Sequence, residues 1–323
     1  ARDIHWTITS TDISPDEQFI VYSTIADTLH LCNIHGEYEI HDDLILDCDG
    51  ERGFGVWCAK FSSGGGELAC GCSNCHVLIY DVERKVTVDH VDAHTDDINA
   101  ICYADMNYRP YLIVSGSDDS LIKVWDRRVM GKSSRPAGIL AGHTEGITHV
   151  TGKGDGVYIL SNSKDQTAKL WDIRKMHEGS TNPAAVTHRC VRFAFDYRWM
   201  DYPGWGEPHK HPHDVSIMTY RGHHVLKTLI RCYFSPVHTT AQQYVYTGSA
   251  DGTVRVYDTL TGEPVVKLGG HRAPVRDAAW HPYKPLIAST SWDGNILHWV
   301  PAASSKEGAR VSVVRDRTVP AQQ

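Results

Sequence analysis

Residues 113–128 read IVSGSDDSLIKVWDRR, and residues 159–174 read ILSNSKDQTAKLWDIR. Each stretch gives two apolar residues, a run of small ones, an Asp at a tight turn, an alternation of apolar and basic residues, and then Trp-Asp-x-Arg. The closing Trp125 and Trp171 are 46 residues apart, a period that is typical of stacked repeat units. A unit this short cannot bury its own apolar faces, so we expect each unit to pack against neighbouring copies.

Other copies follow the same template less closely. They are residues 286–300 (LIASTSWDGNILHWV), 244–258 (YVYTGSADGTVRVYD), 68–81 (LACGCSNCHVLIYD) and a degenerate copy at 19–33. Gly-His or Ala-His pairs precede four units, at His94, His143, His223 and His271. These features resemble the WD-repeat family, which is named after the dipeptide that closes the first two units. The prediction is an all-β WD-repeat β-propeller with six recognisable blades, whose short strands are buried on both faces.

The units also set the expected domain boundaries. We expect residues 1–300 to form the propeller, with an insertion at 177–214 inside one blade, and residues 301–323 to form a polar tail. The pattern stops after Arg174 and resumes at Ser216, where SIMTYRGHH reads as the outermost strand of the same blade. Because the chain opens without Met on residues that resemble the approach to an inner strand, we expect upstream residues of the parent protein to supply a seventh blade.

The resemblance implies a structural role for the recurring polar residues. In WD repeats, the His of the pair, a Ser or Thr, the turn Asp and the Trp form a buried hydrogen-bonded chain. By spacing, the sets here are His94, Ser115, Asp119 and Trp125; His143, Ser161, Asp165 and Trp171; and His271, Ser289, Asp293 and Trp299. A Ser-His-Asp protease is rejected, because the set recurs blade after blade whereas a nucleophile does not.

Composition excludes several classes of protein. The chain has 32 basic and 39 acidic residues and a formal charge of −7, so its net charge predicts no nucleic-acid partner. There is no apolar run of 18 residues and no signal-like N-terminus, which predicts no membrane span and no secretion. Nine scattered cysteines indicate reduced thiols, and we expect a nuclear and cytoplasmic protein without a cofactor.

Two motifs suggest metal or haem sites, and we predict neither. His209, His211 and His213 in the insertion have no fourth ligand or structured spacing. Residues 70–76 (CGCSNCH) contain Cys-x-x-Cys-His, but their cysteines take the places of small residues in the blade template. The insertion itself is either a long loop whose aromatic residues pack on the propeller or a partner-binding element.

The Arg that ends the two best units resembles the double signature of substrate receptors of cullin-four ubiquitin ligases. The resemblance implies contact with the adaptor, damage-specific DNA-binding protein one, from the face where the third strands of the blades end. The implied adaptor-binding residues are Trp125, Asp126, Arg128, Trp171, Asp172 and Arg174, with the Asp residues holding the turn and the Arg residues projecting. The alternative is an ordinary blade ending with a solvated charge.

Longer strings are similar to one subfamily, the cullin-four-associated factor eleven group with its plant counterparts. These strings are SNSKDQTAKLWDIRKM (161–176), DYRWMDYP (196–203), MTYRGHHVLKTLIRCYFSP (218–236) and VRDAAWHPY (275–283). The resemblance implies a non-catalytic subunit that presents substrate proteins for ubiquitination and proteasomal degradation. The competing hypothesis is a general interaction scaffold without a ligase adaptor.

Substrate would then bind at the opposite ends of the strands. We predict that this surface includes Trp57, Lys164, Arg231, Arg276 and Trp292, residue types that are frequent in binding hot spots. The hypothesis is a pocket for an acidic degron peptide with an apolar neighbour. The alternative is that the two arginines neutralise nearby acidic residues such as Asp277.

Overall fold

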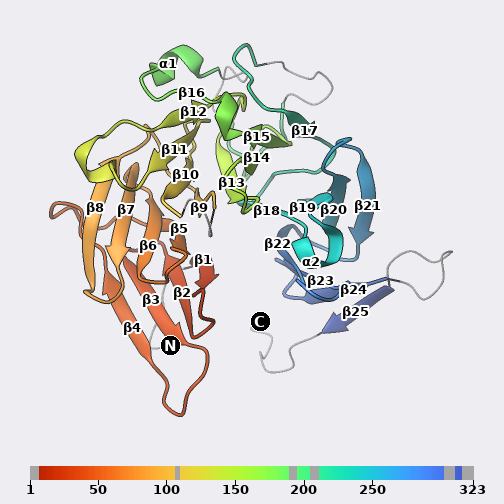
Figure 1. Cartoon of the computed structure of the whole chain (residues 1–323). Coiled ribbons are helices and arrows are strands. Elements are labelled where there is room, and N and C mark those ends of the chain that lie inside the picture. The colour runs from red at the N-terminus through yellow and green to blue at the C-terminus, as the bar shows by residue number, and fades with distance from the viewer. Residues whose placement is uncertain (1–6, 106–109, 189–194, 204–210, 302–309, 315–323) are drawn as a thin grey trace. The chain divides into compact units, whose positions relative to one another are not determined.

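The computed structural model describes residues 7–105, 110–188, 195–203, 211–301 and 310–314. Within these residues the fold is all-β, as predicted, and consists of six antiparallel sheets that form the blades (Figure 1). The first sheet contains β1 (Ile8–Ile13), β2 (Phe19–Thr24), β3 (Thr28–Asn33) and β4 (His41–Ile45). The second contains β5 (Val56–Phe61), β6 (Glu67–Cys72), β7 (His76–Asp81) and β8 (Val86–Asp92).

The two best repeat units form the third and fourth sheets. The third sheet contains β9 (Ala100–Tyr103), β10 (Leu112–Gly116), β11 (Ile122–Asp126), β12 (Gly138–Leu140) and a short edge strand, β16 (His177–Glu178). The fourth contains β13 (Ile147–Gly152), β14 (Tyr158–Ser163), β15 (Thr167–Asp172) and β17 (Met218–Tyr220), which occupies the outermost position expected for it. The start of the insertion therefore adds a strand to the preceding blade, which the sequence did not predict.

The last two repeat units form the remaining sheets. The fifth contains β18 (Cys232–Phe234), β19 (Tyr244–Gly248), β20 (Thr253–Asp258) and β21 (Pro264–Gly269). The sixth contains β22 (Val275–Trp280), β23 (Ile287–Ser291), β24 (Ile296–Val300) and β25 (Arg310–Val314). The expected tail at 301–323 thus differs from the structure, because β25 pairs along the full length of β24 as the fourth strand of its blade.

The helices are short. They are the 3-10 turns η1 (Met130–Lys132) and η2 (Ile173–Lys175) and the α-helices α1 (Pro183–Val186) and α2 (Val237–Thr240). No helix in the described residues is both long enough and apolar enough to span a membrane.

The inner strands β6, β10, β14 and β15 are buried on both faces, as their apolar runs predict, whereas the outermost strand β21 is largely exposed. On β6, Leu68 and Cys70 pack into one buried cluster with residues of β2, β3 and β5. Ala69, between them, faces a second cluster with Val77 and residues of β9–β11. Successive side chains of a strand point to opposite faces, so each blade contributes to two layers of core.

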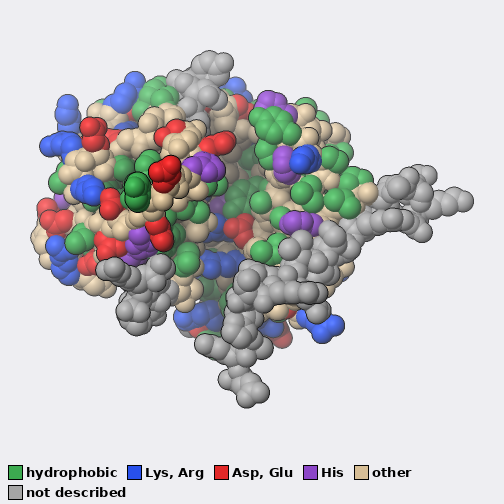
Figure 2. Space-filling model, turned by 90° about the horizontal axis from the view of Figure 1, so that it is seen from below, with side chains coloured by type: hydrophobic (Ala, Val, Ile, Leu, Met, Phe, Trp, Pro, Cys, Tyr) green, Lys and Arg blue, Asp and Glu red, His purple; other side chains and the backbone are tan. Residues whose placement is uncertain are grey.

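The chain divides into two compact units. The first consists of Ala1–Ser161, Leu170–Cys190 and Lys210–Ile217, and the second of Asn162–Lys169, Val191–His209 and Met218–Gln323. Basic and acidic side chains are interspersed on the face shown in Figure 2.

Candidate functional site

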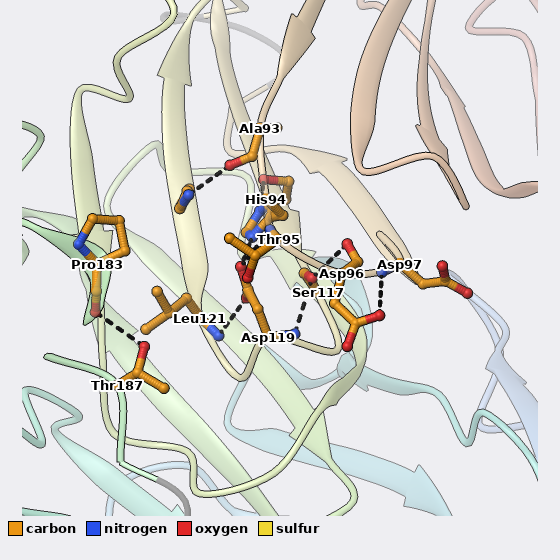
Figure 3. A network of polar contacts seen from close by, with 12 residues as sticks. Ala93, His94, Thr95, Asp96, Asp97, Ser117, Asp119, Leu121, Pro183 and Thr187 are labelled. Atoms are coloured by element: carbon orange, nitrogen blue, oxygen red, sulfur yellow. Dashed lines mark hydrogen bonds and ion pairs between the residues drawn. The ribbon is translucent and has the colours of Figure 1, made fainter. Parts of the chain in front are cut away.

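A buried chain of hydrogen bonds connects β10 and β11 of the third blade with the loop that precedes β9. The Trp125 indole N–H donates to Ser115 Oγ at 2.8 Å, and Ser115 Oγ lies 2.7 Å from His94 Nε2. His94 Nδ1 lies 2.8 Å from Asp119 Oδ2, which requires a proton on Nδ1 and leaves Nε2 to accept from the Ser115 hydroxyl (Figure 3). Burial lowers the pKa of His94 despite the nearby carboxylate. The Ser is therefore fully engaged in a structural chain.

The same arrangement returns in two other blades. In the fourth, Trp171 donates to Ser161 Oγ at 2.7 Å, and His143 Nε2 lies 2.7 Å from the same oxygen. Asp165 accepts from the backbone N–H and hydroxyl of Thr167 at its turn.

In the sixth blade, Trp299 donates to Ser289 Oγ at 2.8 Å, and His271 lies between Ser289 at 2.9 Å and Asp293 at 3.1 Å. Burial opposes ionisation of Asp293, but the N–H groups of Arg272 and Asn295 and the contact with His271 outweigh it and lower its pKa to about 2.

The fifth blade replaces this chain with another. His223 Nε2 lies 2.9 Å from Asn162 Oδ1, and His223 Nδ1 lies 3.1 Å from the Tyr257 hydroxyl. Tyr257 stands where the third, fourth and sixth blades have Trp, and its hydroxyl pairs with the His. Asn162 stands at the Gly116 position of the template and was missed, because the alignment gave no reason to expect a polar side chain there.

The two Trp-Asp-x-Arg endings have one shared geometry. Arg128 donates to the Asp126 carboxylate from Nε at 2.9 Å and from Nη2 at 2.6 Å, and its backbone N–H donates to the same group at 3.0 Å. Arg174 makes the same three bonds to Asp172, at 2.8, 2.7 and 3.0 Å. The hydrogen bonds from the arginines lower the pKa of both carboxyls. Each Asp thus holds both the turn and the guanidinium.

These guanidiniums are nevertheless open to solvent. The side chains of Arg128 and Arg174 are 62% and 64% exposed. Trp125 and Trp171, which we included in the adaptor contact, are buried and position the strand ends instead. A tyrosine lies beside each Arg. The Arg128 guanidinium carbon is 3.6 Å from the centroid of the Tyr111 ring. The hydrogen bond with Asp172 raises the pKa of Arg174, and Tyr158 adds to that shift. Tyr111 was missed, although its place before β10, opposite the end of β11, could have indicated it.

Four of the five predicted substrate residues belong to the second unit. Arg231 Nη1 lies 3.0 Å from Asp277 Oδ2, and the Arg231 N–H donates to the Arg276 carbonyl at 3.0 Å. Burial and the charge of Arg231 lower the pKa of Arg276. The alternative hypothesis of neutralisation therefore describes Arg231, whose charge is paired with that of Asp277.

The insertion contributes to the same surface, which the sequence did not predict. Lys164 Nζ lies 4.2 Å from the centroid of the Tyr197 ring, and the Lys227 N–H donates to the Tyr197 carbonyl at 2.7 Å. Arg198 clamps Asp196 through Nε at 2.9 Å and Nη2 at 2.8 Å, the same geometry as at the blade endings. Trp199 follows and is 85% exposed.

The two tryptophans of the predicted substrate surface differ in accessibility. Trp292 is 58% exposed at the turn between β23 and β24. Trp57 belongs to the first unit, where it is half-buried and donates from its indole to Asp97 Oδ2 at 3.1 Å. Trp292 can therefore offer its ring to a partner more readily than Trp57.

The two sequence motifs that suggested a metal site differ in where their residues lie in the structure. His209 lies outside the described residues, and the rings of His211 and His213 are 6.2 Å apart. Cys70 and Cys72 are buried in the core, and burial raises the pKa of both thiols. The eight cysteines within the described residues are free thiols.

Comparison with known proteins agrees with this architecture. The model of the WD domain, G-beta repeat, matches residues 43–81, 85–126, 134–172, 214–258 and 262–299, more than half of the chain. The chain belongs to the WD40 family. A chain of a mitotic checkpoint complex crystal structure superposes with a TM-score of 0.68 and 18% identity, covering 96% of this chain and 80% of that one, which shows the fold alone.

Curated relatives cover most of this WD40 chain. It is 46% identical over 309 residues to the LEC14B protein of Lithospermum erythrorhizon and 43% identical over 307 residues to the LEC14B homolog of Prunus armeniaca. These matches cover 93% and 92% of this chain and 64% and 63% of those proteins. The chain is 40% identical over 304 residues to the DDB1- and CUL4-associated factor 11 homolog of Caenorhabditis elegans, covering 91% of this chain and 52% of that protein. The predicted resemblance is confirmed, and the chain spans between half and two thirds of these relatives.

Proposed function

We propose that this WD40 chain is a non-catalytic substrate receptor of a cullin-four RING ubiquitin ligase. The observation that carries the proposal is a matched pair of clamps, by which we mean the bidentate hydrogen bonds that hold Arg128 to Asp126 and Arg174 to Asp172. Both arginines are exposed. An arginine fork fixed in one rotamer loses less conformational entropy on binding, which suits an interface residue. The resemblance to DDB1- and CUL4-associated factor 11 homologs supports the adaptor as the partner.

In this proposal the adaptor, damage-specific DNA-binding protein one, contacts the ends of β11 and β15. Substrate proteins bind at the opposite strand ends and are presented for ubiquitination and proteasomal degradation. Lys164, Arg276 and Arg231 supply positive charge there, Trp292 and Trp199 supply exposed aromatic surface, and Trp57 remains a candidate from the first unit. The free thiols support action in the nucleus and cytoplasm, where thiols stay reduced.

The test is binding of the chain to purified adaptor, beside an Arg128→Ala/Arg174→Ala variant. Removing one partner of a hydrogen-bonded charge pair at an interface costs roughly 2–5 kcal/mol, so we expect the variant to lose well over tenfold in affinity. An Arg128→Lys/Arg174→Lys variant keeps the charges but not the bidentate fork, and should bind with intermediate affinity.

Arg198→Ala is the matched control. Arg198 has the same clamp to an Asp two residues earlier and is 61% exposed, but it lies in the insertion and not at a blade ending. Equal binding by the double alanine variant and the unmutated chain would refute the adaptor contact. A complete lack of binding by the unmutated chain would favour a scaffold without a ligase adaptor.

A further inference from the structure

A cluster of three different metal-ligand types lies in the first unit, away from the clamps. The Cys48 thiol, a Glu51 carboxylate oxygen and a His76 ring nitrogen all lie within 4.8 Å of one another. Cys48 and Glu51 belong to the connection between β4 and β5, where they form an isolated antiparallel bridge. His76 is the first residue of β7. The cluster thus joins a loop that follows one blade to the β6–β7 turn of the next.

The tautomer of His76 suits a metal ligand. His76 Nδ1 lies 2.7 Å from the backbone carbonyl of Asn74, which accepts only if Nδ1 carries the proton. Nε2 then holds the free lone pair of the neutral ring. Histidines that bind metals are commonly oriented in this way by a carbonyl behind the ring.

Asn74 supplies a second, independent observation. Its Nδ2 donates to Glu51 Oε2 at 3.0 Å, so the amide holds the carboxylate from behind, as hydrogen-bond partners of metal-binding carboxylates do. Its Oδ1 is buried and finds no hydrogen-bond donor among the described residues. An unpaired buried amide oxygen costs free energy, and a bound cation or a water held by one would satisfy it.

The electrostatic surroundings favour a dication. The acidic side chains of Asp47, Asp49 and Glu51 accompany Cys48 in the connection between β4 and β5, and their negative charge favours a cation there. Tetrahedral coordination at zinc distances separates ligand atoms by about 3.5 Å, which the cluster can reach through small side-chain movements.

We propose that Cys48, Glu51 and His76 form a zinc site with one open position. Thiolate, imidazole and carboxylate together are the donor set that zinc prefers, whereas magnesium and calcium prefer oxygen alone. The site would pin the 46–55 loop to the β6–β7 turn and stabilise the contact between two blades. The prediction of no metal at the CGCSNCH motif is revised in one respect: its His takes part, but with Cys48 and not with Cys72 or Cys75.

A second cluster in the same unit is a weaker candidate. His30, His41 and Asp43 also gather their ligand atoms within 4.8 Å. However, His30 Nδ1 is 2.7 Å from Asp43 Oδ1 and His41 Nε2 is 2.6 Å from the Tyr22 hydroxyl, so these groups already satisfy one another. The absence of a thiolate also makes the two clusters distinguishable in one experiment.

The experiment uses Co²⁺ as a spectroscopic probe of the full chain after treatment with a chelator. We expect about one equivalent to produce a thiolate-to-cobalt charge-transfer band that Zn²⁺ abolishes by displacement. Cys48→Ser should remove the band, and His76→Ala should weaken Co²⁺ binding at least about tenfold. Cys32→Ser is the matched control, because Cys32 is a half-buried thiol in the same unit and should leave the band unchanged.

Folding is monitored by circular dichroism for every variant. Glu51→Gln is a second test variant that leaves the core undisturbed, because Glu51 is exposed. It should also weaken Co²⁺ binding. No thiolate band in the unmutated chain, or a band that survives Cys48→Ser, would overturn the proposal. Neither result bears on adaptor binding, so the two proposals stand or fall separately.

Discussion

Ser115 illustrates how one buried hydroxyl can connect two structural elements. Its oxygen accepts from Trp125 and pairs with His94, and all three side chains are buried. The serine positions and their partners could be predicted, because three blades repeat the set that the WD-repeat resemblance implies. Asn162 and Tyr111 did not follow, because each departs from the repeat or acts across a strand pair. Repetition in the sequence predicts the structure that the blades share, but not the contacts made where one blade departs from the others.

We expect Ser115→Ala to destabilise the protein by about 2 kcal/mol, because it leaves the Trp125 N–H without its acceptor and removes the partner of His94. Ser120→Ala is the control: Ser120 Oγ is buried without a hydrogen-bond partner among the described residues, so its removal should change stability by less than about 0.5 kcal/mol. Urea unfolding measures both. Equal effects of the two substitutions would show that the polar chain does not stabilise the blade.

His223 predicts a loss of stability in acid. Burial lowers its pKa to about 3, well below the 6.5 of an exposed His. Between these values the unfolded chain binds a proton that the folded chain does not, so stability falls as the pH falls, by up to about 1.4 kcal/mol per pH unit. The stability is fully present above pH 6.5.

In His223→Gln this titration is absent. The free energy of unfolding, measured from pH 7 to pH 4, should therefore fall less steeply for the variant than for the unmutated chain. Parallel curves would mean that His223 does not titrate differently in the folded and unfolded states.

At the scale of the element, the turns between the second and third strands share one backbone conformation. The last turn residue is left-handed in several blades, as Ser120 (φ 71°), Gln166 (φ 68°), Gly252 (φ 78°) and Gly294 (φ 75°). Asp-Gly, which is present at two of these turns, is a residue pair typical of a positive φ, whereas Ser120 and Gln166 give no such signal in the sequence. The order of the strands within a blade could be predicted because the units repeat in the sequence. The β16 and β25 additions were not, because their sequences do not repeat.

Glycine at these turns should have opposite effects at two positions. Ser120→Gly relieves a left-handed Ser and should stabilise by about 0.5 kcal/mol, the difference between the left-handed penalty and the entropy of Gly. Gln166→Gly relieves the same backbone but removes a side chain that accepts from the Val225 N–H at 2.7 Å and donates to its carbonyl at 3.1 Å. It should destabilise by about 2 kcal/mol. Thermal unfolding of both variants checks this, and shifts of the same sign would contradict it.

At the scale of the whole molecule, sequence and structure differ in what they establish. Repeats identified the fold class, and matching strings identified the relatives. The clamp geometry at Arg128 and Arg174 was not derivable, because Trp-Asp-x-Arg gives the residues but not the bidentate bond or the exposure. The Tyr197 segment was likewise beyond prediction, since no repeat fixes where an insertion packs.

We propose that adaptor and substrate bind through separate sets of residues, which predicts independent binding. In the fourth blade, Lys164 precedes β15 and Arg174 follows it. Interactions that share no residues are expected to add, so saturating adaptor should leave the affinity for an acidic substrate peptide with an aromatic or aliphatic residue unchanged. Arg128→Ala/Arg174→Ala should weaken only adaptor binding, by well over tenfold, and Arg276→Glu should weaken only peptide binding, by at least about tenfold.

Fluorescence anisotropy of such a peptide, with and without adaptor, measures all four combinations of these variants. Peptide affinity that depends on adaptor would indicate a coupling free energy between the two surfaces. Adaptor binding that Arg276→Glu weakens as strongly as the clamp variant does would place both partners on one face. Additive effects are the outcome required of a receptor that holds its substrate while bound to a ligase.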